Sequence, residues 1–222
     1  MKYSVFIFLS VFILQKAFSQ KAPNAYDNEG KRHGLWKVFF EGTNQPKFEG
    51  NFEHGQEVGK FSFYKKGFPE HPSAVMNFEK DKDSIQVTYF TQKGEPISTG
   101  KMVDKKREGK WVYYHQSSLD TMMTEEYKHD KLNGLQKTFF RNGQVTEETM
   151  YNNDLKDGKS FVYSEGGTLL QKLNFREGEL QGPAEYYNAK GEKIIEGQYN
   201  KDRKTGTWYY FENGEVKKEK EY

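Results

Sequence analysis

The sequence predicts an all-β fold, an elongated and twisted antiparallel sheet of tandem β-hairpins. Three observations predict this fold. A short aromatic-rich phrase recurs about eight times at a spacing of 24 or 25 residues, an aromatic residue holds one fixed place in every copy, and turn signals follow that residue. Each copy is too short to contain a helix or to bury a face alone. Neighbouring copies must therefore stack into one sheet.

The first 19 residues have the pattern of a signal peptide. Lys2 precedes an apolar stretch at Val5–Leu14, and Ala17-Phe18-Ser19 resembles a cleavage site ahead of Gln20. The apolar stretch is shorter than the roughly 20 residues of a membrane-spanning helix. We therefore expect an exported protein, periplasmic or extracellular, that does not span a membrane.

The composition excludes several classes of function. Without the predicted signal peptide, which contains Lys2 and Lys16, the chain has 32 basic and 32 acidic residues. A neutral chain with interspersed charges has no large field to attract nucleic acid. The absence of cysteine excludes disulfides, a lipoprotein anchor, thiol catalysis and a cysteine-bound zinc site. The 16% aromatic content argues against disorder and predicts a core of rings.

Residues 20–33 are expected to form a partial hairpin or cap, and residues 34–222 the repeat domain. Seven of the eight repeats start with a glycine, and the third starts with a serine. The starting residues are Gly34, Gly59, Ser84, Gly109, Gly134, Gly158, Gly182 and Gly206.

Within each repeat, the first strand is rich in the aromatic and β-branched residues that suit a pleated surface. Turn signals such as Asn142-Gly143 and Asn213-Gly214 follow it, because both positions of Asn-Gly tolerate positive φ. A return strand with alternating residue types comes next. The second repeat has a longer turn at Phe68–Pro72, which marks either a binding face or ordinary surface variation.

The fifth residue after each start is always aromatic, and we interpret this position as the core. These residues are Phe39, Tyr64, Tyr89, Tyr114, Phe139, Tyr163, Tyr187 and Phe211. The residues two and four after each start vary, and exposed Trp and Tyr often anchor interfaces. The candidate binding residues are Trp36, Phe61, Phe63, Trp111, Tyr113, Tyr186, Trp208 and Tyr210. The alternative is that both faces pack as the sheet coils.

No constellation of residues indicates catalysis, a cofactor or a metal. The five histidines show no metal-binding spacing. Glu49, Glu148, Glu196 and Glu219 recur three residues before an aromatic of the return strand. A repeated acid of this kind is expected to pair with a lysine on the neighbouring strand. The sequence therefore predicts a protein that is not an enzyme.

The repeats resemble MORN repeats (membrane occupation and recognition nexus). Glu29-Gly30-Lys31-Arg32-His33-Gly34 is similar to the glycine-lysine link of that family, and Gly50-x-Phe52 and Gly197-x-Tyr199 are similar to its Gly-x-Trp step. The longer period, with Trp36, Phe61, Trp111 or Trp208 in place of a second glycine, resembles the bacterial MORN-variant repeats catalogued as YwqK-type antitoxins. The resemblance spans residues 34–222.

The resemblance implies a hairpin-repeat sheet used for protein or lipid interaction, or for neutralising a toxin. Together with the predicted export, it suggests an interaction scaffold or adaptor in the cell envelope, with an unknown protein as its partner. An exported antitoxin-like or immunity protein is one alternative. A module that binds a glycan or a lipid through an aromatic face is another.

Overall fold

The computed structural model describes residues 22–79 and 82–222, which form one open antiparallel sheet. The predicted signal peptide lies outside the described residues. Among those described there are 19 strands and no helix, so none that could cross a membrane. The strands are β1 (Ala25–Tyr26), β2 (Arg32–Phe39), β3 (Pro46–Glu53), β4 (Gln56–Phe63), β5 (Ala74–Phe78), β6 (Ser84–Phe90), β7 (Pro96–Val103), β8 (Lys106–Tyr114), β9 (Thr121–Lys128), β10 (Lys131–Leu132), β11 (Gly134–Phe139), β12 (Val145–Asn152), β13 (Leu155–Tyr163), β14 (Leu169–Arg176), β15 (Glu179–Leu180), β16 (Gly182–Tyr187), β17 (Lys193–Asn200), β18 (Arg203–Glu212) and β19 (Glu215–Glu221).

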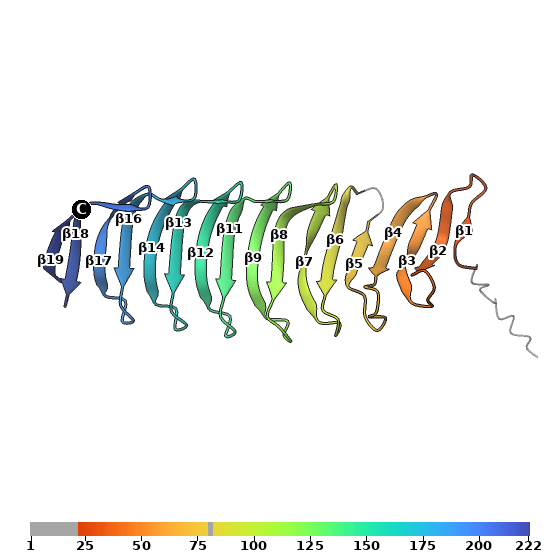
Figure 1. Ribbon diagram of the computed structural model, residues 1–222, viewed down its shortest axis with the longest axis horizontal. Helices are drawn as coiled ribbons and strands as arrows, with labels where there is room; N and C mark the ends of the chain where they lie inside the picture. Colours follow the sequence, from red (N-terminus) through yellow and green to blue (C-terminus); the bar gives the residue numbers. More distant parts are fainter. Residues whose placement is uncertain (1–21, 80–81) are drawn as a thin grey trace, which may run out of the picture.

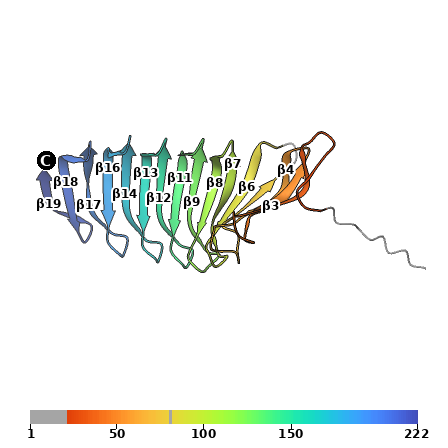
Figure 2. The same cartoon turned by 45° about the vertical axis from the view of Figure 1, so that its right-hand side comes forward.

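When β10 is counted with β11 and β15 with β16, each strand pairs with its neighbours along the chain, which confirms the predicted array of hairpins. The short strands β10 and β15 are the first parts of strands that continue as β11 and β16. Figure 1 shows the curved strands side by side along the long axis of the molecule, and they remain a single row in Figure 2. The described chain therefore has no second layer, and its core must form on one face of the sheet.

Side chains alternate between the two faces of a strand, and the pairing continues this alternation across the sheet. We call one face the core face. Its central row is Trp36, Gly50, Phe61, Met76, Val87, Gly100, Trp111, Glu125, Gln136, Thr149, Ser160, Leu173, Ala184, Gly197 and Trp208. Most of these side chains are buried, and Trp208 and Val87 are 0% exposed.

The opposite face carries most of the Lys–Glu pairs, and we call it the charged face. Its central row is Lys37, Glu49, Ser62, Val75, Thr88, Thr99, Val112, Thr124, Lys137, Glu148, Phe161, Lys172, Glu185, Glu196, Tyr209 and Glu219. Each member lies opposite the next on the neighbouring strand. The row therefore runs without a break from β2 to β19.

The third hairpin is offset by one residue from the predicted spacing. Val87 pairs with Gly100 in the way that Trp36 pairs with Gly50, so Ile85 takes the starting position assigned to Ser84. Phe90, not Tyr89, then holds the constant aromatic position. The Phe68–Pro72 turn makes the second hairpin one residue longer than the first, and this shifts the next start. We use "constant rings" below for Phe39, Tyr64, Phe90, Tyr114, Phe139, Tyr163, Tyr187 and Phe211.

Large rings on the core face lie directly over glycines of the preceding strand. A Cβ atom added at Gly100 would stand 2.3 Å from the Trp111 ring, and one at Gly197 would stand 2.2 Å from the Trp208 ring. Phe61 lies over Gly50 in the same way. The rings of one hairpin thus cover the backbone of the previous one. This contact lets an open sheet build a core without a second layer.

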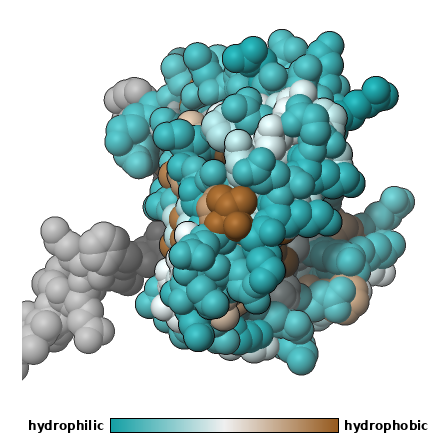
Figure 3. All heavy atoms as spheres, turned by 90° about the vertical axis from the view of Figure 1, so that its left-hand side faces the viewer, coloured by the Kyte–Doolittle hydropathy of each residue, from teal (hydrophilic) through white to brown (hydrophobic). Residues whose placement is uncertain are grey.

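The two ends of the array are closed in different ways. At the N-terminal end, β1 pairs with β2, and the Tyr26 ring meets the Trp36 ring edge-on at 5.2 Å. At the C-terminal end, every residue of β19 is exposed. Figure 3 shows that this end is largely hydrophilic, with one small apolar patch. Charged edge strands of this kind discourage pairing with other chains.

Candidate functional site

The structure reverses the predicted roles of the two faces. Among the candidate binding residues, Trp36, Phe61, Trp111 and Trp208 are buried on the core face, and Trp111 is 2% exposed. Each indole N–H donates to a backbone carbonyl, as in the 3.1 Å bond from Trp111 to Lys101. The prediction that these side chains lie on an exposed recognition face is wrong, because all four are buried. Phe61, Trp111 and Trp208 lie over glycines of the preceding strand, and Trp36 packs against Tyr26.

The other four candidate binding residues, Phe63, Tyr113, Tyr186 and Tyr210, lie half-exposed on the same core face. Each tyrosine of this set exchanges a hydrogen bond with a tyrosine of its return strand. The hydroxyl oxygens are 3.4 Å apart for Tyr113 and Tyr127, and 3.1 Å apart for Tyr186 and Tyr199. Only the rims of these rings reach solvent, so they form the edge of the core.

The constant rings lie on the charged face, which corrects their assignment to the core. The Tyr64 hydroxyl donates to Glu49 at 3.0 Å, and the Tyr187 hydroxyl donates to Glu185. Both acids belong to the central row of the charged face. Phe39 is 45% exposed, and the other constant rings are half-exposed. Residues that vary least in type thus line an accessible surface here.

Lysine–glutamate pairs lie beside several of these rings. Lys37 binds Glu49 at 3.1 Å, and Lys137 binds Glu148 at 2.6 Å, which confirms the predicted cross-strand partners of these two repeated acids. Lys172 binds Glu185 at 2.9 Å. The hydrogen bond from Tyr187, followed by that from Lys172, lowers the pKa of Glu185. These acids are already paired, so they are poor candidates for acid–base catalysis.

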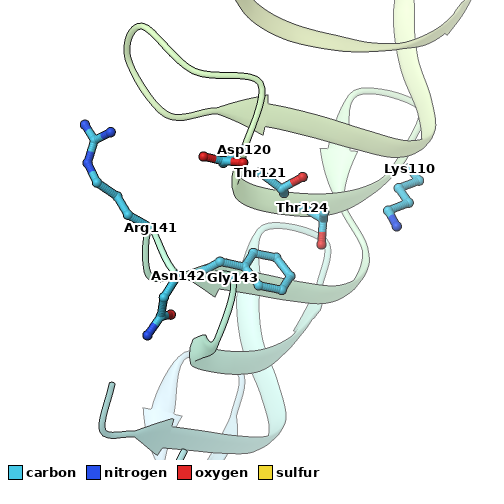
Figure 4. Close-up of a pocket in the computed structure, with 8 residues that line it drawn as sticks. Lys110, Asp120, Thr121, Thr124, Arg141, Asn142 and Gly143 are labelled. Carbon is cyan, nitrogen blue, oxygen red and sulfur yellow. The ribbon is translucent and has the colours of Figure 1, made fainter. Parts of the chain in front are cut away.

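A hollow of about 400 Å³ opens on the charged face beside β8, where β9 begins and β11 ends. Its lining residues are Lys110, Asp120, Thr121, Thr124, Phe139, Arg141, Asn142 and Gly143. Figure 4 shows Arg141 extending away from Thr124 and Lys110, so the charged groups do not converge on one point. The hollow is a depression in a broad surface, with the ring of Phe139 as its apolar part.

A buried polar network interrupts the core face in the middle of the sheet. Glu125 is 7% exposed and accepts hydrogen bonds from Tyr127 at 2.5 Å and from Gln136 at 2.8 Å. Next to it, the hydroxyls of Thr149 and Ser160 lie 2.7 Å apart. The spacing of these residues in the sequence does not reveal this network. A carboxylate with both oxygens occupied inside the protein favours a structural role.

Burial raises the pKa of seven tyrosines, and for several of them a nearby carboxylate adds to the effect. They are Tyr64, Tyr113, Tyr127, Tyr151, Tyr163, Tyr186 and Tyr187. The pKa of Tyr187 rises to about 12, through burial and its bond to Glu185. These hydroxyls are therefore neutral donors at physiological pH and not bases.

These tyrosines predict alkaline unfolding. A tyrosine whose pKa is higher in the folded state stabilises the fold fully below the unfolded pKa of about 10, and this contribution is lost as pH rises through the folded value. We expect circular dichroism and tyrosinate absorbance to change together above pH ~10. Complete ionisation of the tyrosines near pH ~10 with unchanged dichroism would contradict this prediction.

Three potential metal ligands meet at the N-terminal end of the sheet. One ligand atom each from Asp27, His33 and His54 lie within 4.8 Å of one another. The Nδ1 of His54 is 2.8 Å from Asp27 Oδ2, and the two imidazole rings are 5.3 Å apart. The pKa of Asp27 is lowered, first by the backbone N–H of Lys31. The sequence spacing did not reveal this cluster, because the three residues come from two turns and a strand.

Residues 132–153 match the family model described as MORN repeat variant. The matched segment is one hairpin, from Leu132 in β10 through β11 and β12. It confirms the resemblance at this hairpin, and the other hairpins of the sheet repeat its pattern. No curated protein sequence matches the chain at a significant level.

Proposed function

We propose that this protein is an exported, non-enzymatic scaffold that binds a protein partner in the cell envelope through its charged face. The observation that carries the proposal is the periodic surface on that face. Half-exposed constant rings recur once per hairpin beside a continuous row of side chains that carries Lys–Glu pairs on β2–β3, on β11–β12 and on β14–β17. Rings framed by charges and hydroxyls supply the apolar contact area and polar rim of a protein interface.

The arrangement of acids supports a non-enzymatic role. Glu49, Glu148 and Glu185 are held in ion pairs, and the buried Glu125 is occupied by Tyr127 and Gln136. The tyrosines beside these acids keep their protons because their pKa values are raised. No acid of these two networks is left poised to exchange a proton with a substrate.

The proposed location rests on the N-terminal sequence. A basic residue, the apolar stretch Val5–Leu14 and a small-residue cleavage pattern are the features of an export signal. A protein without cysteine that folds through ring stacking needs no oxidising compartment for stability. The fold is therefore compatible with export but does not depend on it.

Removing constant rings is the test of this function. We expect Phe39→Ser combined with Phe139→Ser to weaken capture of the partner from an envelope extract by at least about tenfold, as loss of interface anchors does. Unfolding should change much less, because Phe39 is 45% exposed. Quantitative pull-down with immobilised protein measures the affinity for the partner, and thermal unfolding measures the stability of each variant.

The matched control is Leu155→Ser. Leu155 is 50% exposed, begins strand β13 beside Gly178, and is not one of the constant rings. It should leave capture unchanged. Equal loss of capture in both variants would refute a role for the constant rings. Binding of a polysaccharide or of liposomes, without a protein partner, would replace the scaffold by a glycan- or lipid-binding module.

A further inference from the structure

The N-terminal end of the sheet holds Asp27, His33 and His54 in fixed positions. Asp27 lies in the turn between β1 and β2, and its Oδ1 accepts hydrogen bonds from the backbone N–H groups of Glu29 and Lys31, both at 2.9 Å. Its Oδ2 remains directed at His54. His33 belongs to β2 and lies opposite Ala25. Asp27 and His33 are therefore oriented by the backbone of the β1–β2 hairpin.

His54 reaches the cluster from the turn between β3 and β4. That turn is tied to β2 by a 2.8 Å hydrogen bond from the Gly55 N–H to the Arg32 carbonyl. The His54 side chain is 68% exposed, whereas the Asp27 side chain is 11% exposed. The cluster thus has a nearly buried carboxylate at its base and an imidazole on its solvent side, so an ion can enter without unfolding the sheet.

The chemistry of the three groups selects a class of ion. Two imidazoles and one carboxylate suit zinc and other late first-row divalent metals, whereas calcium and magnesium prefer oxygen ligands. The Nδ1 of His33 is buried and has no hydrogen-bond partner in the described part of the chain. Lys31 and Arg32 are the two basic residues just before His33 in the sequence. The Lys31 ammonium is paired with Glu29 at 2.8 Å.

We propose that Asp27, His33 and His54 form a binding site for a zinc-class divalent metal ion. Ligand atoms of tetrahedral zinc lie roughly 3.3 Å apart, given bond lengths of about 2.0–2.1 Å. The present spacing closes to this value when the exposed His54 ring rotates and exchanges its contact with Asp27 for one with the ion. Water takes the fourth position. The bound ion joins the β1–β2 turn, β2 and the β3–β4 turn, and so fastens the end of the array.

Isothermal titration of the tag-free protein with Zn²⁺ tests the site. We expect one ion per chain, and a thermal midpoint that rises with Zn²⁺ but not with Mg²⁺. His54→Asn and His33→Asn should each weaken Zn²⁺ affinity at least about tenfold, since even changes to groups behind the ligands of a metal site cost 10- to 100-fold. Asparagine is native at the equivalent positions Asn153 and Asn133, so both variants should fold.

His129→Asn is the matched control. His129 occupies the same turn position in the fourth hairpin, with φ 51° against 46° for His54, and it belongs to no metal-ligand cluster among the described residues. Its substitution should leave the affinity unchanged. Absence of zinc heat, or equal weakening by His54→Asn and His129→Asn, would overturn the proposal. Asp27→Asn, which keeps an oxygen for the backbone N–H groups, gives a third ligand test in a folded chain.

Discussion

Replacing Trp111 by alanine is expected to destabilise the protein by about 3–5 kcal/mol, the usual cost of removing a large buried ring. Trp111 is 2% exposed and lies at the centre of a core cluster with Val87, Tyr127 and Leu132. Its ring stacks on Tyr89 at 6.2 Å. Truncation would leave a cavity that the neighbouring hairpins cannot close, because the backbone on both sides is fixed by pairing.

Urea unfolding measures this loss of stability. It should be followed by the circular dichroism of the backbone, because tryptophan fluorescence changes with the substitution itself. Tyr114→Ala is the control, because Tyr114 lies three residues further along the same strand but is a half-exposed constant ring. It should cost less than half as much. If Trp111→Ala left stability intact and removed partner binding, the original interpretation of the tryptophans as recognition residues would be restored.

The architecture was predictable because it depends on period and residue type. A spacing of 24 or 25 residues, Asn-Gly turns and alternating strands each predict hairpins, and nothing in the distant parts of the chain changes that outcome. The match of residues 132–153 to a MORN repeat variant and the 19-stranded sheet agree with it. The offset of the third hairpin escaped prediction because a longer turn breaks an assumed period.

The buried face was not predictable from the constancy of residue type. Alternation shows which residues share a face but not which face is buried. On the core face, a large side chain on one strand compensates in volume for a small one on the neighbouring strand. The large Trp111 ring lies against Gly100, and the smaller Val87 lies between Met76 and Gly100. The residue types in such a row can therefore vary from hairpin to hairpin while the core remains fully packed. The constant rings follow a register shift near the strand ends, where most hairpins have the same local shape.

The two clusters that sequence analysis missed share a cause. Glu125 and Gln136 come from strands β9 and β11, whereas His33 comes from β2 and His54 from the turn between β3 and β4. Their meeting depends on the exact register of the sheet. A one-residue change in register would place each partner on the opposite face. Residue spacing alone does not contain that information, whereas the pairing of β2, β3 and β4 does.

Replacing Gly100 by alanine is expected to destabilise the protein by about 2–3 kcal/mol, the cost of overpacking a close contact. An alanine Cβ would stand 2.3 Å from the Trp111 ring, well inside van der Waals contact. The ring cannot move away freely, because its N–H is bonded to the Lys101 carbonyl and Tyr89 and Tyr127 contact its ring. The added methyl group should therefore destabilise the fold by its clash with the Trp111 ring.

A double-mutant cycle measured by urea unfolding separates this steric effect from backbone propensity. In the Trp111→Ala background, Gly100→Ala should become neutral or slightly stabilising, because alanine is favoured over glycine within a strand by roughly 0.5–1 kcal/mol once the clash is gone. Gly166→Ala, which meets nothing closer than 3.8 Å, is the control and should be close to neutral in both backgrounds. The same cost for Gly100→Ala with and without the indole would show that the ring does not lie over this glycine, and the core would then need another explanation.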